Sequence, residues 1–228
     1  EIRSQIPIFY YNIWDDLPYP MWNEPFYESV DLLMNITKQT WNIVRNVRQQ
    51  VPVEDWQNTL VPHGINEDVF FPIESTHEKY KEFLEKKDAI VKNKNTKFIM
   101  LWNNRNIRRK LPGDVILAWN HFLNMLPKED RKNCLLIMKT PPIDNNGTNL
   151  IEVIKHNCQD ADIFFVTERL AEHEMNYLYN MADMTLNIAS NEGFGLATAE
   201  SLMAGTPIVV NVTGGLQDQC GFTKEDGS

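Results

Sequence analysis

The chain has 228 residues, of which 43% are hydrophobic, 23% charged and 11% aromatic. This composition is typical of a globular protein with a sizeable core, and it excludes collagen, disordered and integral membrane proteins, since no stretch approaches ~18 consecutive apolar residues. The formal net charge of -9 argues against a nucleic-acid partner, because binding to nucleic acid depends on Lys and Arg displacing counterions from phosphates.

The first part of the chain predicts a small α/β unit. Residues 6–11 indicate a strand that is already under way where the sequence begins, and residues 30–36 indicate a second strand. Residues 38–50 follow with Trp41, Val44 and Val47 on one side, which predicts a helix. The chain begins without Met and ends in a polar segment after Gly214-Gly215, which we interpret as a loop, so we expect both ends to be cut.

Residues 60–72 predict a linker between two domains, because they are rich in turn formers and are punctuated by Pro62, Gly64 and Pro72. The next segment, residues 78–92, alternates charges of opposite sign and predicts a helix exposed to solvent.

From residue 97 onward, short apolar runs alternate with segments of helical period, which predicts βαβ units around a parallel sheet with helices on both faces. The predicted strands are 97–102, 134–138, 163–166, 184–188 and 207–210. Helices are predicted around 115–126, 175–182 and 196–204, the last of them ending at Gly205. We therefore expect an α/β, Rossmann-like fold for this part of the chain.

A glycine-bearing loop between the fourth of these strands and the next helix carries the clearest chemical signal. Gly193 and Gly195 let backbone N–H groups approach a ligand, and a helix N-terminus offers further N–H donors, which together favour an anion such as a diphosphate. Glu192 lies in the loop and Glu200 in the helix. Because ionised carboxylates only accept hydrogen bonds, the rest of the ligand should carry hydroxyls, as sugars and ribose do.

Basic residues follow the first strand of the same region, within residues 103–110. Arg105 could fork onto phosphate oxygens and Lys110 could add a point charge. A solvated loop is the alternative interpretation, but ligands in open α/β folds bind at the carboxyl ends of the strands, and this position favours anion binding.

Residues 60–219 resemble the C-terminal, donor-binding half of the retaining glycosyltransferases of family 4, which have the GT-B fold. The family's E-x7-E motif is matched at residues 192–210, EGFGLATAESLMAGTPIVV, and its pattern continues at residues 214–216. Residues 168–183 resemble the family's strand, turn and LY..AD helix. Arg105 and Lys110 match its G-R-x4-K element, with Asn104 in place of the glycine, and residues 60–72 resemble its linker, with His63 in place of Asn. His63 is accordingly interpreted as a linker residue.

The resemblance implies a metal-independent enzyme that transfers a sugar from a nucleotide-sugar, such as a UDP- or GDP-sugar, to an acceptor with retention of configuration. The substrate is the nucleotide-sugar, and no cofactor is implied. Arg105 and Lys110 would hold the diphosphate, Glu192 would contact the transferred sugar, and Glu200 would accept from ribose. The remaining residues implied to contact the donor are Gly193, Phe194, Gly195, Leu196, Thr198, Arg169 and Leu170.

The resemblance also divides the chain into domains. Residues 1–59 would be the end of an N-terminal, acceptor-binding domain, 60–72 the linker and 73–228 the donor-binding domain. Residues 10–24 are dense in aromatic side chains, which suit either sugar stacking or a Pro-rich loop pinned by buried rings. The implied acceptor is a saccharide or a lipid-linked molecule, and the full-length protein could contact a membrane peripherally. We expect the 228-residue chain alone to bind a sugar nucleotide but to transfer the sugar slowly or not at all.

Three alternatives stay open at this point. Asp160 and Asp162 spell the D-x-D motif of metal-dependent glycosyltransferases, although they precede a predicted strand and so fall at the wrong end of the sheet. The chain could also be a sugar-nucleotide-binding module without catalysis, or a sugar-nucleotide epimerase of the same fold. The three cysteines are widely spaced, which makes the cytoplasm the simplest location for any of these.

Overall fold

A computed structural model describes residues 6–49 and 53–221. The chain forms two compact units. The first contains the described residues of 1–64, 191–196 and 212–228, and the second contains 65–190 and 197–211. The chain first passes from one unit to the other at residues 64 and 65, within the segment 60–72, whose role as an interdomain linker stays a prediction.

The first unit contains a three-stranded parallel sheet in the order β1-β2-β3. The strands are β1 (Phe9–Asn12), β2 (Leu32–Asn35) and β3 (Asn58–Leu60), and the helices α1 (Glu24–Glu28) and α2 (Lys38–Val47) accompany them. The predicted first two strands and the helix after them are confirmed, although Gln50, the predicted end of that helix, lies outside the described residues. The sequence did not predict β3, because three residues next to a run of turn formers are too short to show a period.

Helix α2 begins where a side chain caps it. The Oγ1 of Thr37 accepts a hydrogen bond from the backbone N–H of Thr40 at 3.1 Å, which satisfies one of the unpaired donors of the first turn. The apolar side of the helix packs Ile43, Val44 and Val47 with Tyr27 and Leu33 into the core of this unit.

Three buried asparagines cross the same sheet. Asn12 donates to the side-chain oxygen of Asn35 at 3.2 Å, and Asn35 donates to that of Asn58 at 2.6 Å. All three side chains are buried, and Asn35 is 0% exposed. Because a buried amide is costly unless its hydrogen bonds are made, this ladder favours one pairing of the three strands.

The second unit contains the predicted five-stranded parallel sheet, in the order β6-β5-β4-β7-β8. Its strands are β4 (Phe98–Asn103), β5 (Cys134–Lys139), β6 (Asp162–Phe165), β7 (Met184–Asn187) and β8 (Ile208–Val210). Its helices are α3 (Tyr80–Ile90), α4 (Pro112–Met125), α5 (Lys128–Arg131), α6 (Leu150–Asn157), α7 (Glu172–Met181) and α8 (Leu196–Met203), the last beginning at the boundary with the first unit. The predicted α/β, Rossmann-like fold is confirmed.

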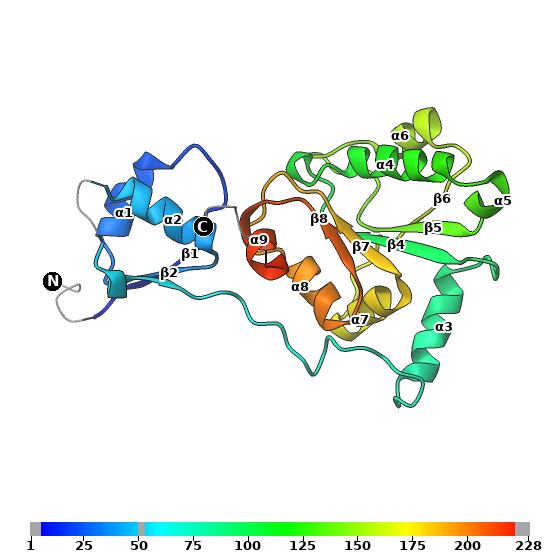
Figure 1. Cartoon of the computed structure of the whole chain (residues 1–228), viewed down its shortest axis with the longest axis horizontal. Helices are drawn as coiled ribbons and strands as arrows, with labels where there is room; N and C mark the ends of the chain where they lie inside the picture. Colours follow the sequence, from blue (N-terminus) through cyan, green and yellow to red (C-terminus); the bar gives the residue numbers. More distant parts are fainter. Residues whose placement is uncertain (1–5, 50–52, 222–228) are drawn as a thin grey trace. The chain divides into compact units, whose positions relative to one another are not determined.

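Helices cover both faces of this sheet (Figure 1), so its central strands are apolar on both sides. Along β5, Leu135 and Ile137 join a core with α3 and α7, whereas Leu136 and Met138 join a second core with α4 and α6. This is why the strands of this unit appear in the sequence as continuous apolar runs rather than alternating ones.

Glycine is required at two bends. Gly205 has φ +78° where α8 ends, as predicted, and a Cβ there would lie 3.1 Å from Cγ of Pro72. In the first unit, the interpretation of Gly214-Gly215 as a loop was wrong, because these residues open a further helix, α9 (Gly214–Cys220). A Cβ on Gly214 would collide with the carbonyl oxygen of Glu192, so the start of α9 packs too closely for any side chain.

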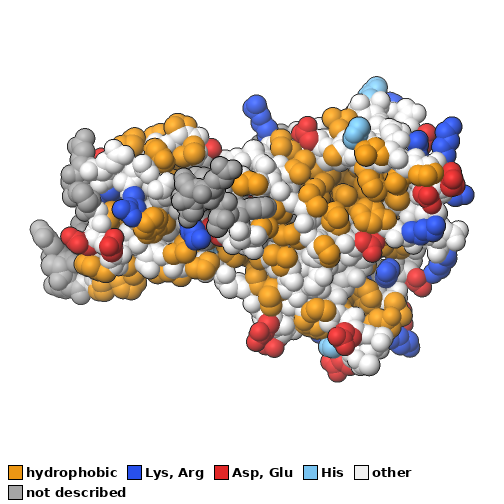
Figure 2. Space-filling model, viewed as in Figure 1, with side chains coloured by type: hydrophobic (Ala, Val, Ile, Leu, Met, Phe, Trp, Pro, Cys, Tyr) orange, Lys and Arg blue, Asp and Glu red, His pale blue; other side chains and the backbone are white. Residues whose placement is uncertain are grey.

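Both units expose hydrophobic and charged side chains on the face that Figure 2 shows. Figure 2 shows Lys, Arg, Asp and Glu side chains intermixed on the second unit near α5, where Lys97 and Asp130 form an ion pair at 3.7 Å. It also shows hydrophobic side chains on the surface of the first unit, where Phe9, Trp22 and Phe26 are exposed. Within the described residues, no helix is both long enough and apolar enough to span a bilayer.

The asparagine ladder generates a stability prediction. Asn35→Ala removes the central amide and leaves the side-chain oxygen of Asn58 without its donor. We expect the free energy of unfolding of the first unit to fall by roughly 1–3 kcal/mol, the cost of a buried polar group left unpaired. Chemical denaturation followed by circular dichroism measures this, with Asn42→Ala on the exposed side of α2 as the matched control. Equal denaturation midpoints for the two variants would contradict a stabilising ladder.

Candidate functional site

The strand order of the second unit reverses at one position in its sheet, between β4 and β7. From β4 the chain continues through β5 and β6 on one side, whereas β7 and β8 lie on the other side of β4. We call the edge at which these strands end the carboxyl edge. In open α/β sheets, ligands bind at the carboxyl edge where the strand order reverses, which here is between β4 and β7.

The loops that follow β4 and β7 meet at this point. The backbone N–H of Ser190, after β7, donates to the carbonyl oxygen of Arg109, after β4, at 2.8 Å. After β8, the side chain of Asn211 donates to the carbonyl oxygen of Ala189, just after β7, at 3.1 Å. The backbone at the reversal is therefore held by hydrogen bonds between segments that are distant in sequence.

The loop after β4 carries the two cations that the sequence singled out. Its last residues form a 3-10 turn, Arg108–Lys110, and Lys110 is buried at 8% exposure. The next residue, Leu111, has φ +52°, a left-handed conformation that is costly for a bulky side chain. Strained backbone of this kind persists where the surrounding structure holds it, and it is found preferentially at functional sites.

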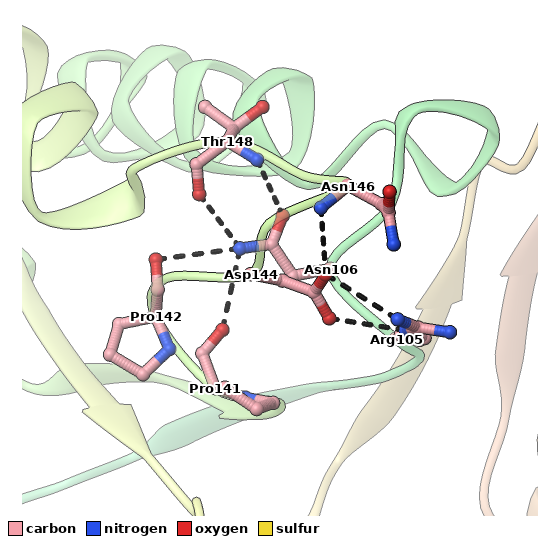
Figure 3. A network of polar contacts seen from close by, with 7 residues as sticks. All are labelled: Arg105, Asn106, Pro141, Pro142, Asp144, Asn146 and Thr148. Carbon is pink, nitrogen blue, oxygen red and sulfur yellow. Dashed lines mark hydrogen bonds and ion pairs between the residues drawn. The ribbon is translucent and has the colours of Figure 1, made fainter.

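Arg105 lies on the same loop, and its side chain is directed to an aspartate from the loop after β5 (Figure 3). Its Nε lies 3.1 Å from Oδ2 of Asp144 and its Nη2 lies 3.4 Å from Oδ1. The Arg105 guanidinium lowers the pKa of Asp144, and the N–H of Asn146, which also donates to that carboxylate, lowers it further. The Arg105 side chain remains 62% exposed, so it can still reach a ligand.

Asn106 binds the two loops together (Figure 3). Its side-chain amide is fully buried, donates to the carbonyl oxygen of Thr148 at 2.7 Å and accepts from the N–H of Thr148 at 3.0 Å. The same amide also donates to the carbonyl oxygens of Pro141 and Pro142. A Cβ on Gly147 would collide with Asn106, so the approach of the loops requires glycine at that position.

The second glutamate of the motif, Glu200, lies on α8 and is held from α7. The hydroxyl of Tyr179 donates to its Oε2 at 2.5 Å, and Asn103, the last residue of β4, donates to the Tyr179 oxygen at 2.7 Å. Burial raises the pKa of Glu200, an effect that the Tyr179 hydrogen bond opposes and the nearby Glu172 carboxylate reinforces. The structure thus brings the end of β4 and the glutamate of α8 together through one tyrosine.

The other motif glutamate, Glu192, lies in the loop 191–196 of the first unit, where its side chain is buried. Its carbonyl oxygen accepts from the N–H of Gly215 at 3.1 Å. The carbonyl oxygen of Phe194 accepts from Gln219 at 2.6 Å, and the Phe194 ring packs edge-on against His63 with centroids 5.3 Å apart. The glycine of this loop at position 195 has φ +89°, a conformation that favours glycine.

The remaining predicted residues lie in different surroundings. Arg169 and Leu170 follow β6 and so lie beyond its carboxyl end. Thr198 is buried on α8, and its hydroxyl accepts from Asn187 at 3.2 Å, which gives it a structural role whatever ligand binds. Asp160 and Asp162 lie at the amino end of β6, the edge opposite to the one that holds Arg105 and Glu200.

Sequence reasoning missed Asp144 and Tyr179 as partners of Arg105 and Glu200. Asp144 lies 39 positions from Arg105, in a segment whose Asn and Gly residues indicate only a turn. Tyr179 belongs to an apolar helical stripe, so periodicity alone assigns it to the core. For Tyr179, the resemblance to the family's LY..AD helix was the only signal, and it does not predict a hydrogen bond to Glu200.

Solved structures of similar fold cover both units of the chain. The N-terminal domain of Candida albicans trehalose-6-phosphate phosphatase aligns with a TM-score of 0.71 and 14% identity, over 95% of this chain and 54% of that one. Anabaena Alr3699/HepE in complex with UDP and glucose aligns with a TM-score of 0.68 and 13% identity, over 95% of this chain and 56% of that one. At these identities the likeness establishes the fold, which is that of the GT-B glycosyltransferases.

Two curated proteins have similar sequences. Alpha-monoglucosyldiacylglycerol synthase of Acholeplasma laidlawii is 26% identical over 156 residues, which are 68% of this chain and 36% of that protein. D-inositol 3-phosphate glycosyltransferase of Xylanimonas cellulosilytica is 25% identical over 158 residues, 69% of this chain and 36% of that protein. The chain therefore aligns with about a third of the length of these relatives.

The match to a protein family extends well beyond the E-x7-E motif. Residues 85–225, more than half of the sequence, match the family described as glycosyl transferases group 1. This range begins within α3 and includes the loops that carry Arg105, Asp144 and Glu192, as well as Glu200 on α8. The chain belongs to the glycosyl transferases group 1 family.

Proposed function

We propose that this chain is the donor-binding part of a glycosyltransferase that moves a sugar from a nucleotide-sugar, such as a UDP- or GDP-sugar, to an acceptor. The proposal includes retention of configuration at the sugar and catalysis without a metal ion. Family membership supports sugar transfer from a nucleotide-sugar. Because the chain aligns with only 36% of each curated relative, the activity of the whole protein is part of the proposal.

One observation supports the proposal most strongly: cations and a hydroxyl-accepting carboxylate occur at the same edge of one sheet. Arg105 and Lys110 follow β4, and Glu200 is tied through Tyr179 to Asn103, the last residue of β4. A nucleoside diphosphate carries negative phosphates next to a ribose with two hydroxyls. Cations for the first group and an acceptor for the second, at the reversal of strand order, fit that molecule better than a simple anion.

During transfer, the bond between the sugar and the diphosphate breaks and negative charge develops on the departing phosphate. Arg105 and Lys110 would stabilise that charge, because fixed cations in a partly desolvated site contribute most where charge develops. For Glu192 and the backbone of 194–196 we keep the role implied by the resemblance, contact with the transferred sugar and the phosphate. Backbone at Arg169 and Leu170 would contact the base.

The acceptor is proposed as a saccharide or a lipid-linked molecule. The two curated relatives are named after a glucosyldiacylglycerol and after inositol 3-phosphate, so their names support the transferase class rather than one acceptor. The cytoplasmic location also stays a proposal, supported by free thiols at Cys134, Cys158 and Cys220.

The phosphate role of Arg105 is tested by removing its side chain. We expect Arg105→Ala to weaken binding of a nucleoside diphosphate roughly ten- to a hundredfold, from ~1.5–3 kcal/mol for hydrogen bonds to a charged group. Binding of the corresponding nucleoside should not change, because it has no phosphate. Calorimetry with UDP, GDP and ADP and with their nucleosides measures both affinities.

The matched control for Arg105→Ala is Lys128→Ala, which removes the same charge from exposed α5, before β5 and away from the carboxyl edge. We expect this control to bind both ligands as the unchanged chain does. Equal losses for nucleoside and diphosphate in Arg105→Ala would show that Arg105 supports the fold rather than the phosphate.

Metal independence is tested by chelation. Because Arg105, Lys110 and the N-terminus of α8 can offset the phosphate charge, we expect the dissociation constant for the nucleoside diphosphate to stay the same when EDTA is added. Asp160→Asn combined with Asp162→Asn should also leave it unchanged. Complete loss of binding after chelation, restored by a divalent cation, would contradict this part of the proposal.

A further inference from the structure

Glu200 is held by a relay of two hydrogen bonds that joins three elements of the second unit. Asn103 at the end of β4 donates to the hydroxyl oxygen of Tyr179 on α7, and Tyr179 donates to Oε2 of Glu200 on α8. Tyr179 is 0% exposed, so water does not compete for its hydroxyl. Thr206, after α8, donates to the backbone carbonyl of Tyr179 at 2.7 Å, so α7 is also bonded to the segment that follows α8.

The direction of these bonds follows from the chemistry of the three groups. A side-chain amide N–H can only donate, so Asn103 occupies a lone pair of the tyrosine oxygen. The tyrosine has a single proton, and the only acceptor left to it in this relay is the carboxylate. The proton is therefore directed at Oε2 of Glu200. Among the described residues the Glu200 side chain makes no other hydrogen bond, so its Oε1 is available to a ligand.

Burial and neighbouring charges shift the pKa values of both Glu200 and Tyr179. Burial and the Glu172 carboxylate both raise the pKa of Glu200, which favours the protonated acid, whereas the Tyr179 hydrogen bond favours the ionised form. Burial and the neighbouring Glu200 also raise the pKa of Tyr179 well above its usual value, so Tyr179 remains a donor at neutral pH. The titratable groups that face Glu200 are thus Tyr179 and Glu172, both on α7, while Asn103 from β4 is neutral.

We propose that Tyr179 is a positioning residue, anchored by Asn103, that fixes Oε2 of Glu200 and leaves Oε1 to accept from the ribose hydroxyls, which makes the site selective for ribonucleotide donors. This inference rests on the proposed function, since it assumes that Glu200 meets ribose. A carboxylate that can only accept is satisfied by a ribose diol and is left without a donor by a dideoxyribose. By positioning Glu200, the buried Tyr179 therefore contributes to the preference for a ribose over a dideoxyribose.

The test compares two ligands that differ only in the ribose hydroxyls. The nucleoside diphosphate that binds best among UDP, GDP and ADP is titrated by calorimetry beside its 2′,3′-dideoxy form. We expect Tyr179→Phe to weaken binding of the ribonucleotide roughly tenfold, the order of a hydrogen bond to a charged group, and to leave dideoxynucleotide binding unchanged. A purely structural role for Tyr179 would weaken both ligands equally and would overturn the proposal.

The pH dependence gives a second readout. Ribonucleotide binding needs an ionised Glu200, so it is lost as the pH falls through the pKa of that group. Without the tyrosine hydrogen bond this pKa is higher, and we expect the acid limb of the binding curve to move to higher pH in Tyr179→Phe. An acid limb that does not move would contradict the relay. Tyr177→Phe, which removes the hydroxyl of another buried tyrosine of α7, is the matched control and should change neither readout.

Two further variants, Glu200→Ala and Asn103→Ala, distinguish a wrong assignment of Glu200 from a wrong role for Tyr179. If Glu200→Ala keeps the full preference for ribose, the assignment of Glu200 in the proposed function fails. If Glu200→Ala loses the preference but Tyr179→Phe keeps it, the proposed function stands and the relay alone is wrong. Should Tyr179→Phe fail to fold, Asn103→Ala decides, because losing the anchor is expected to reduce the ribose preference severalfold, and an unchanged preference would overturn the proposal.

Discussion

The reversal of strand order between β4 and β7 determines where the loops that carry Arg105, Lys110 and Ser190 come together. Because all five strands of the second unit are parallel, every loop that follows a strand leaves from the same edge. The loops after β4 and β7 run in opposite directions from neighbouring strands, and the hydrogen bond from Ser190 to Arg109 holds them together. The parallel topology thus brings residues as far apart in sequence as Arg105 and Glu200 to the same edge.

Two of the charged groups at this edge, Arg105 and Glu200, are each held by a residue from a different loop or helix. Asp144 from the loop after β5 holds Arg105, and Tyr179 from α7 holds Glu200. Fixing a long side chain before the ligand arrives reduces the conformational entropy lost on binding.

The parts of the fold that sequence predicted are those with a strong local signal. The five apolar runs became the five strands of a sheet whose central strands are buried on both faces, and the motif glycines marked the loop after β7, where Gly195 has φ +89°. The failures had weak or misleading local signals. Strand β3 is three residues long, and Gly214-Gly215 are glycines because the 191–196 loop lies too close for a side chain, although such a pair usually indicates a loop rather than a helix start. No pattern within one segment could pair Arg105 with Asp144, because that contact exists only once β4 and β5 lie side by side.

In the proposed function, the carboxyl edge binds a nucleoside diphosphate with its phosphates at the loop after β4 and its ribose at Glu200. A crystal structure of the chain soaked with the nucleoside diphosphate that binds best tests this most directly. We predict phosphate oxygens within hydrogen-bond distance of Arg105 and Lys110, and both ribose hydroxyls donating to the carboxylate of Glu200. A ligand seated at the opposite edge, beside Asp160 and Asp162, or one whose ribose lies away from Glu200, would contradict the account.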